Sequence, residues 1–197
     1  MKTLVVACSA LMLASLPTSA APIPKGAQSA NLLVNGSFED VADADASRPL
    51  DKGSTAVKGW VVTRGQIDVT QQHENVWKAH HGKRGLDLHG SPGFGGVEQT
   101  IATKPGKKYK VAFRMSGNPG VPEHKKVQLG VRAAGRDREF DLTMEGRTYE
   151  DLKWEEMTWE FTANEKTTVI EFHTAMPATS NGLGGPLLDD VRVFEIN

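Results

Sequence analysis

Two segments of the chain alternate polar and apolar residues, which would place their polar side chains on one face of a β-sheet. In the first segment, Asp87 and His89 flank Leu88. In the second segment, Arg114 lies between apolar residues, and Asn118 follows at its end. An aspartate–arginine pair can hold two hydroxyl groups of a ligand by charge-assisted hydrogen bonds. The alternative is a solvated sheet face with a weak Asp87–Arg114 ion pair.

Trp77 is the tryptophan whose surroundings differ most from those of a core residue. It precedes the polar stretch 78–81 and has no apolar partner segment beside it, whereas Trp60 and Trp159 lie in core-like patterns. Sugar sites combine an aromatic platform with polar side chains. We therefore predict a ligand site with Trp77 as its platform, which comprises Trp77, Asp87, His89, Arg114 and Asn118. Packing of Trp77 at the edge of the core is the alternative.

The sequence contains no recognisable catalytic constellation. Its six histidines lack the spacing of a zinc hydrolase helix, and the adjacent His80 and His81 would face opposite ways in a strand. The segment 89–93 lacks the leading glycine and the following helix of a serine nucleophile turn. Acidic residues are scattered, so no pair suited to glycoside hydrolysis stands out. We therefore expect a protein that is not an enzyme.

Short alternating segments separated by glycine, proline, asparagine and aspartate predict an all-β protein. The expected strands are 32–34, 60–62, 67–69, 85–88, 97–101, 108–116, 125–133, 138–142, 153–162, 167–174 and 187–194. No segment sustains a helical pattern of apolar residues. This number of strands predicts a single jelly-roll β-sandwich of two antiparallel sheets, with loops at 41–58, 91–96, 117–124 and 175–185.

The two ends of the predicted domain have similar sequences, because each combines a short apolar segment with carboxylates. These ends are 31–39 and 185–193, and we expect them to form neighbouring first and last strands. Asp189 shares strand parity with Val191 and Val193, which predicts that it points inward. A buried carboxylate needs a cation or hydrogen bonds to offset its lost hydration.

The first twenty residues have the pattern of a secretory signal peptide. Lys2 is followed by an apolar stretch at 4–16 and by small residues at 18–20. We expect a signal peptide at 1–20, a flexible lead-in at 21–30, and one domain at 31–197. Loss of the signal would remove Cys8, the only cysteine, which suits a secreted protein, periplasmic or extracellular, that needs no disulfide.

The charge of the chain and its apolar segments each argue against one class of partner. The formal net charge is −1 and no basic stripe occurs, so we expect no nucleic-acid partner. No second long apolar segment follows the signal, so we expect no membrane association after its cleavage.

An ordered set of motifs resembles a known family. The motifs are Asn31–Glu39, Gly59–Trp60, Gly65–Val69, Trp77–Ala79, Gly82–Gly90, Gln99–Thr100, Pro105–Gly106, Tyr109–Asn118 and Leu188–Val191. In this order they resemble the secreted proteins grouped as domain of unknown function 642 in plant cell walls, whose bacterial relatives are called choice-of-anchor C proteins. The resemblance implies a galactose-binding-like fold and an association with wall polysaccharide or with wall-modifying enzymes such as pectin methylesterase.

The two ends also resemble carbohydrate-binding modules of families 4 and 22, which hold a structural calcium ion near their joined termini. The resemblance implies calcium ligands at the backbone of Ser37, the Glu39 carboxylate, the backbone of Arg84 and the Asp189 carboxylate. The remaining acidic ligand of those modules falls at His81. Because calcium prefers oxygen ligands, we expect this site to be weakened, lost, or completed by water or Asp190.

Together, these patterns predict a secreted, non-catalytic carbohydrate-binding protein that recognises cell-wall or extracellular polysaccharide, or a glycoconjugate. The alternative is a protein-interaction module that docks on an envelope or wall-modifying enzyme, with an extracellular protein as its partner. A hydrolase is a third, less favoured reading. Nothing in the sequence specifies the glycan or the oligomeric state.

Overall fold

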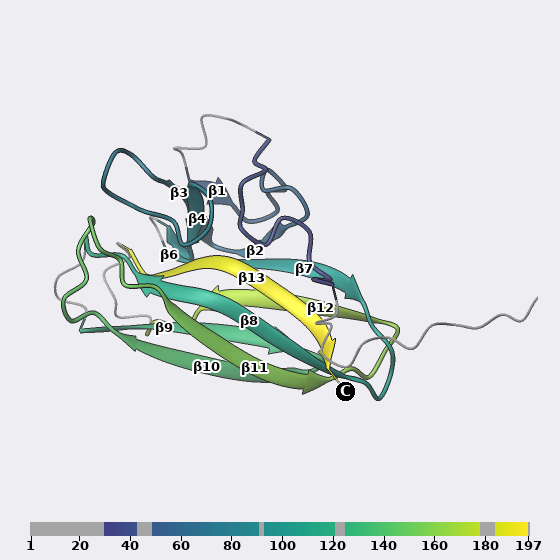
Figure 1. Cartoon of the computed structure of the whole chain (residues 1–197). Coiled ribbons are helices and arrows are strands. Elements are labelled where there is room, and N and C mark those ends of the chain that lie inside the picture. Colours follow the sequence, from purple (N-terminus) through teal and green to yellow (C-terminus); the bar gives the residue numbers. More distant parts are fainter. Residues whose placement is uncertain (1–29, 43–48, 91–92, 121–124, 178–183, 197) are drawn as a thin grey trace, which may run out of the picture.

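The computed structural model describes residues 30–42, 49–90, 93–120, 125–177 and 184–196, which form two β-sheets packed face to face (Figure 1). The predicted signal peptide and nearly all of the predicted lead-in lie outside the described residues. Every pairing within the sheets is antiparallel. The structure therefore confirms the predicted all-β sandwich.

The larger sheet has six strands and the smaller sheet has five. The six-stranded sheet follows the order β1 (Leu50–Asp51), β3 (Gln66–Gln71), β4 (Arg84–Asp87), β13 (Pro186–Ile196), β8 (Lys108–Gly117) and β11 (Glu155–Thr162). The five-stranded sheet follows the order β10 (Arg136–Thr143), β9 (Lys126–Ala133), β12 (Thr167–Thr174), β7 (Gly96–Ala102) and β2 (Val61–Arg64). A small hairpin of β5 (His89–Gly90) and β6 (Gly93–Phe94) follows β4.

Aromatic side chains from both sheets join in the core. Phe113 of β8 meets Phe172 of β12 edge to face, with ring centroids 5.2 Å apart. Trp60, which is 2% exposed, contacts Phe172 and also Phe38 of the N-terminal segment. Burial of each such ring contributes about 2–3 kcal/mol. The alternation of apolar residues in the sequence therefore identified the inward face of these strands correctly.

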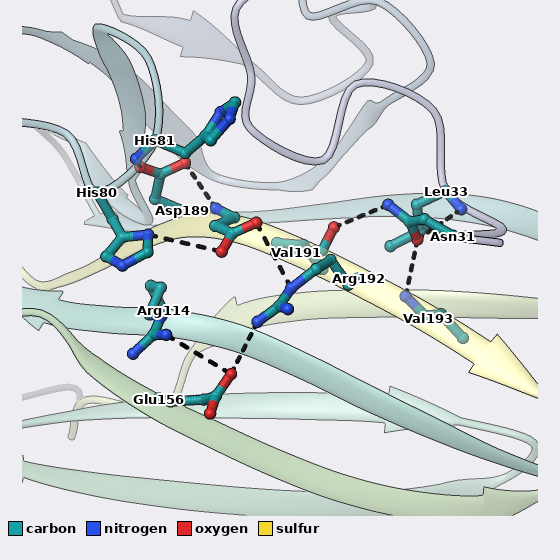
Figure 2. A network of polar contacts seen from close by, with 11 residues as sticks. Asn31, Leu33, His80, His81, Arg114, Glu156, Asp189, Val191, Arg192 and Val193 are labelled. Atoms are coloured by element: carbon teal, nitrogen blue, oxygen red, sulfur yellow. Dashed lines mark hydrogen bonds and ion pairs between the residues drawn. The ribbon is translucent and has the colours of Figure 1, made fainter. Parts of the chain in front are cut away.

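The N-terminal segment lies beside β13 as expected, but it is not a strand. Leu32 N–H donates to the Val193 carbonyl at 2.8 Å, and Val191 N–H donates to the Gly36 carbonyl at 2.8 Å. The side-chain oxygen of Asn31 accepts the N–H of Val193 at 2.9 Å, so it replaces a backbone partner (Figure 2). Residues 33–37 form bends and a turn, which interrupt a continuous ladder. The predicted strand at 32–34 was therefore wrong, although the prediction that this segment lies beside the last strand was correct.

A bulge in β13 changes the direction in which Asp189 points. Asp189 lies opposite Arg114 of β8, whereas Arg192 lies opposite Ala112, so β13 has one extra residue between these pairs. Asp190, with a φ of 46°, lies within this bulge. Since an extra residue reverses the alternation of a strand, Asp189 shares a face with Arg114 rather than with Val191 and Val193. Asp189 is buried, but the parity argument that predicted an inward direction was wrong.

Three very short strands were missed by the sequence interpretation. β1 lies within the predicted loop 41–58, while β5 and β6 lie between residues 89 and 94. Strands of two residues are too short to show the alternation on which the prediction depended.

Candidate functional site

Asp87 is the centre of a buried polar cluster at one end of the six-stranded sheet. Its side chain is only 2% exposed, and its Oδ1 accepts the backbone N–H groups of His89 at 2.9 Å and Gly185 at 3.2 Å. Its Oδ2 accepts the Asn118 side-chain amide at 2.8 Å. One carboxylate therefore connects β4, the end of β8 and the residue before β13. The structure thus brings together Asp87 and Asn118, two residues of the predicted ligand site.

Burial raises the pKa of Asp87 to about 7, because the lost hydration outweighs the hydrogen bonds from Asn118, His89 and Gly185. Asp68 lies opposite Asp87 on β3 and raises this pKa further. Asp68 itself is half-buried, and burial raises its pKa as well. Sequence reasoning did not single out Asp68, although its alternation with Ile67 and Val69 would have placed it on this face.

His89 lies beneath the surface next to Asp87. It is 1% exposed, its Nδ1 lies 3.4 Å from the Thr174 hydroxyl, and its ring packs edge-on against Phe94. In this conformation His89 and Asp87 are covered by other residues, so their observed contacts support the surrounding chain. The sequence reasoning expected both residues to contact a ligand directly, but neither side chain has exposed surface for such a contact in this conformation.

Arg114 lies away from Asp87. The residue of β8 that is level with Asp87 is Ser116, through Leu187 of β13. Arg114 lies two residues before Ser116 in β8, at about 7 Å from that row. The guanidinium of Arg114 lies 3.7 Å from Glu156, which also binds Arg192 at 2.7 Å (Figure 2). The expected Asp87–Arg114 pair does not form, because the register between the strands separates the two residues.

His80 covers the Arg114 region from the loop between β3 and β4 (Figure 2). Its Nδ1 lies 3.5 Å from Asp190. Burial, assisted by the nearby positive charge of Arg114, lowers the pKa of His80 despite the attraction of Asp190. His80 is therefore neutral at neutral pH, and its contact with Asp190 is not an ion pair there.

Trp77 is held in a fixed aromatic pair with Tyr149. Trp77 N–H donates to the Tyr149 carbonyl at 2.8 Å, and the two ring centroids lie 5.1 Å apart with a tilt of 54°. Trp77 is half-buried and has a φ of 56°, while Tyr149 is 37% exposed. A β-carbon added to Gly120 would lie 2.5 Å from the Tyr149 hydroxyl, and Gly120 N–H donates to the Asn118 side chain. The aromatic pair therefore lies next to Asn118.

Tyr149 is a member of this site that the sequence reasoning missed. It occurs in the charged stretch 145–155, where two aromatic residues, Tyr149 and Trp154, were the available signal. This stretch is anchored by Arg147, which donates to the carbonyl of buried Leu152 at 3.0 Å. Trp154 Nε1–H donates to the Lys78 carbonyl at 2.9 Å, which connects the same stretch to the Trp77 loop. Both loops that carry the aromatic pair are thus fixed to each other.

The residues of the expected calcium site lie close together, but backbone N–H groups surround their carboxylates. Glu39 Oε1 accepts the N–H groups of Lys83 at 2.9 Å and Arg84 at 2.8 Å. The two oxygens of Asp189 accept the N–H groups of His81 at 2.8 Å and Asp190 at 2.6 Å. Burial nevertheless raises the pKa of Asp189 to about 7.

This donor set fits calcium poorly, because N–H groups use the oxygen lone pairs that the ion needs. Ser37 is half-buried beside Glu39, and the predicted backbone ligands at Ser37 and Arg84 stay predictions. In the part of the chain that the structure describes, no group of three or more histidine, cysteine, aspartate or glutamate residues is arranged to hold a metal ion.

Calcium dependence can be measured by thermal unfolding. The amide contacts favour an unchanged melting temperature when a chelator is added, because Glu39 and Asp189 already have hydrogen-bond partners. A melting temperature that falls with chelator and recovers with added calcium would instead support the site implied by the resemblance. Magnesium, which prefers a smaller octahedral site, serves as the control ion.

Comparison with known families shows which family this chain belongs to. The family model described as "Protein of unknown function (DUF642)" matches residues 31–194. The chain belongs to the DUF642 family. This DUF642 chain is also 31% identical over 175 residues to halomucin of Haloquadratum walsbyi (strain DSM 16790 / HBSQ001). The match covers 86% of the DUF642 chain but only 2% of the length of halomucin.

Solved structures share the sandwich fold of the DUF642 chain. A family 61 carbohydrate-binding module in complex with β-1,4-galactotriose is similar with a TM-score of 0.57 and 17% identity, over 85% of this chain and 100% of the module. An arabinose-bound family 51 α-L-arabinofuranosidase is similar with a TM-score of 0.53 and 17% identity, over 87% of this chain and 27% of the enzyme. A family 4 carbohydrate-binding module has a TM-score of 0.47 and 16% identity, over 83% and 99% of the two chains. At these identities the likeness shows the fold alone.

No helix among the described residues of the DUF642 chain is long and apolar enough to cross a membrane.

Proposed function

We propose that this DUF642 protein is an exported, non-catalytic carbohydrate-binding protein whose ligand is an extracellular polysaccharide. The observation that carries the proposal is the fixed pair of Trp77 and Tyr149 beside the Asn118 amide, which we call the aromatic surface. Support for the ligand class comes from the shared fold with the module solved in complex with β-1,4-galactotriose. Export rests on the signal pattern of residues 1–20.

The aromatic surface has the parts that sugar recognition requires. Aromatic rings stack on the apolar C–H faces of sugar rings, and a neighbouring amide can bind their hydroxyl groups. Asp87 holds the Asn118 side chain from below, so the amide is oriented before a ligand arrives. A preoriented group loses little conformational entropy on binding, which favours affinity. Asp87 therefore acts in this proposal as a positioning residue rather than as a ligand contact.

Substitution of Trp77 by alanine should weaken binding to a retained polysaccharide by at least about fivefold, since loss of one stacking ring costs about 1 kcal/mol. Affinity electrophoresis in gels that contain β-1,4-galactan, xylan or arabinan measures this change. Tyr149→Ala should have a similar effect, and Tyr149→Phe should preserve stacking. Val34→Ala removes an exposed apolar side chain from another part of the molecule and is the control.

Two results would count against this function. Absence of retention of the wild-type protein by every polysaccharide, pectins included, would contradict carbohydrate binding itself. Retention that is equal for wild type, Trp77→Ala and Tyr149→Ala, with unchanged thermal unfolding, would show that the aromatic surface is not the binding site.

A further inference from the structure

A second surface with the features of a ligand site lies on the outer face of the five-stranded sheet. A cavity of about 430 Å³ opens there above β7, β9 and β12. We call it the β12 groove and define it by Glu98, Arg132, Asn164, Thr167, Val169 and Glu171, which are among its lining residues. Its volume lies within the range of about 300–1,000 Å³ that is typical of small-ligand sites. The sequence reasoning identified none of these residues as functional.

Strand register brings the charged residues of the groove into one row. Glu171 of β12 lies opposite Glu98 of β7 on one side and opposite Arg132 of β9 on the other. Because directly opposite residues share a face of a sheet, all three side chains emerge on the same outer surface. The row is built from strands that are distant in sequence, so only the tertiary structure shows it.

The charge of Glu171 is already balanced within the protein. Its Oε1 accepts hydrogen bonds from the Thr63 hydroxyl at 2.8 Å and from Arg64 Nε at 3.1 Å, and its Oε2 lies 3.4 Å from Arg132. Burial alone would raise the pKa of Glu171, but the contacts with Thr63 and Arg64 together lower it below the ordinary value. Glu171 therefore stays ionised. Because its oxygens already have partners within the protein, its role is structural rather than that of a cation ligand. Arg132 also binds Asp137 at 2.7 Å, so its charge is balanced as well.

Glu98 differs from Glu171 because its carboxylate makes no hydrogen bond or ion pair within the part of the chain that the structure describes. It is half-buried in the same row. A half-buried carboxylate without a partner is a strong acceptor for hydroxyl groups of a ligand. Val169, which is 43% exposed, supplies an adjacent apolar surface for C–H groups.

Two connected turns contribute to the lining of the groove. The Asn164 side-chain amide donates to the Ala134 carbonyl at 3.1 Å, which links the turn before β12 to the turn between β9 and β10. Thr167 is exposed and lines the groove, and Glu165 adds another carboxylate to the lining. The lining therefore combines hydrogen-bonding groups with a small apolar patch, as a hydroxyl-rich ligand requires.

We propose that the β12 groove is a second carbohydrate site, which binds a neutral oligosaccharide segment and rejects glycans that carry carboxylates. The inference rests on the proposed function and adds a ligand class to it. Glu171 and Arg132 are both paired within the protein, so Glu98 and Glu165 set the charge of the lining, and an anionic sugar would face an unfavourable field. Neutral hydroxyl groups can instead donate to Glu98 and accept from Thr167.

Amide NMR of the full chain with short oligosaccharides tests this site directly. Neutral probes are β-1,4-galactotriose, xylotriose and cellotriose, and trigalacturonate is the acidic probe. We expect at least one neutral probe to shift the amide signals of Glu98, Val169 and Glu171, while trigalacturonate leaves them unchanged. Glu98→Ala should weaken the groove response at least fivefold, and Glu98→Gln should allow trigalacturonate to bind. Glu160→Ala, on the exposed side of β11, is the matched control.

The outcomes separate this inference from the proposed function. Shifts confined to the signals around Trp77, Tyr149 and Asn118 would overturn the groove and leave carbohydrate binding intact. Binding of trigalacturonate to the wild-type groove as tight as that of the neutral probes would overturn the charge selection. Absence of any groove shift with all neutral probes would overturn the groove, whereas the proposed function is overturned only if no polysaccharide, pectins included, retains the protein.

Discussion

Replacement of Gly36 by alanine should lower the free energy of unfolding by about 3 kcal/mol. A β-carbon at this position would lie 2.0 Å from the Val191 carbonyl oxygen and 3.1 Å from its carbon, so backbone atoms would have to move. The same residue accepts the Val191 N–H at 2.8 Å, and a shift that relieves the clash would break this bond. The contact lies at the bulge of β13, where the N-terminal segment meets the last strand. Urea denaturation followed by tryptophan fluorescence measures the change.

Ser37→Ala is the control for this experiment, because it changes the next residue without adding an atom against β13. We expect its effect to be below about 0.5 kcal/mol, as for most substitutions outside the core. A loss below about 1 kcal/mol for Gly36→Ala would contradict the close packing of the N-terminal segment on β13.

The free energy of unfolding should fall as the pH rises from about 4 to about 7, through the titration of Asp87 and Asp189. Both carboxyl groups have a folded-state pKa of about 7, whereas the ordinary value is 3.8. The folded protein therefore holds more protons than the unfolded chain in this window, and stability declines with pH. Each shift corresponds to a few kcal/mol, on the order of 1.4 kcal/mol per pH unit. Urea denaturation at pH 5, 6, 7 and 8 measures the slope.

Asp87→Asn should make this profile flatter, because asparagine does not ionise and its oxygen can still accept from His89 and Gly185. The Asn118 amide must turn to meet the new NH₂ group, so some stability is lost at pH 5. Asp141→Asn, which removes an exposed carboxylate on β10, should leave the profile as it is. Stability that stays level or increases between pH 5 and 8 in the wild type would show that neither aspartate is held in its protonated form.

Glu171, whose pKa is lowered, acts in the opposite direction, and its stabilising contribution is lost as the pH falls through its folded-state pKa.

These two predictions concern the framework that holds the proposed binding surfaces. Gly36 tests how the N-terminal segment closes on β13, and Asp87 tests the polar cluster beneath the aromatic surface. Neither experiment depends on a ligand, so both remain informative whatever the glycan is.

The sequence alone determined the kind of fold, the inward residues of most strands and the family. Alternation of apolar residues is a local property, and it correctly placed Phe113 and Phe172 in the core. Tight turns of glycine and asparagine separate the strands, and the ordered motifs predicted a family that the match over residues 31–194 confirms. The neighbouring position of the two ends was also correct, and backbone hydrogen bonds join the N-terminal segment to β13.

The tertiary structure alone decided which polar residues meet. Register joins Asp87 to Asn118 and separates it from Arg114, and a single extra residue in β13 reverses the direction of Asp189. Two loops far apart in the sequence pair Trp77 with Tyr149. Three distant strands place Glu98, Glu171 and Arg132 in one row. Alternation specifies the face of a residue within its own strand, but register, bulges and loop contacts depend on other strands, and a local pattern contains no information about them.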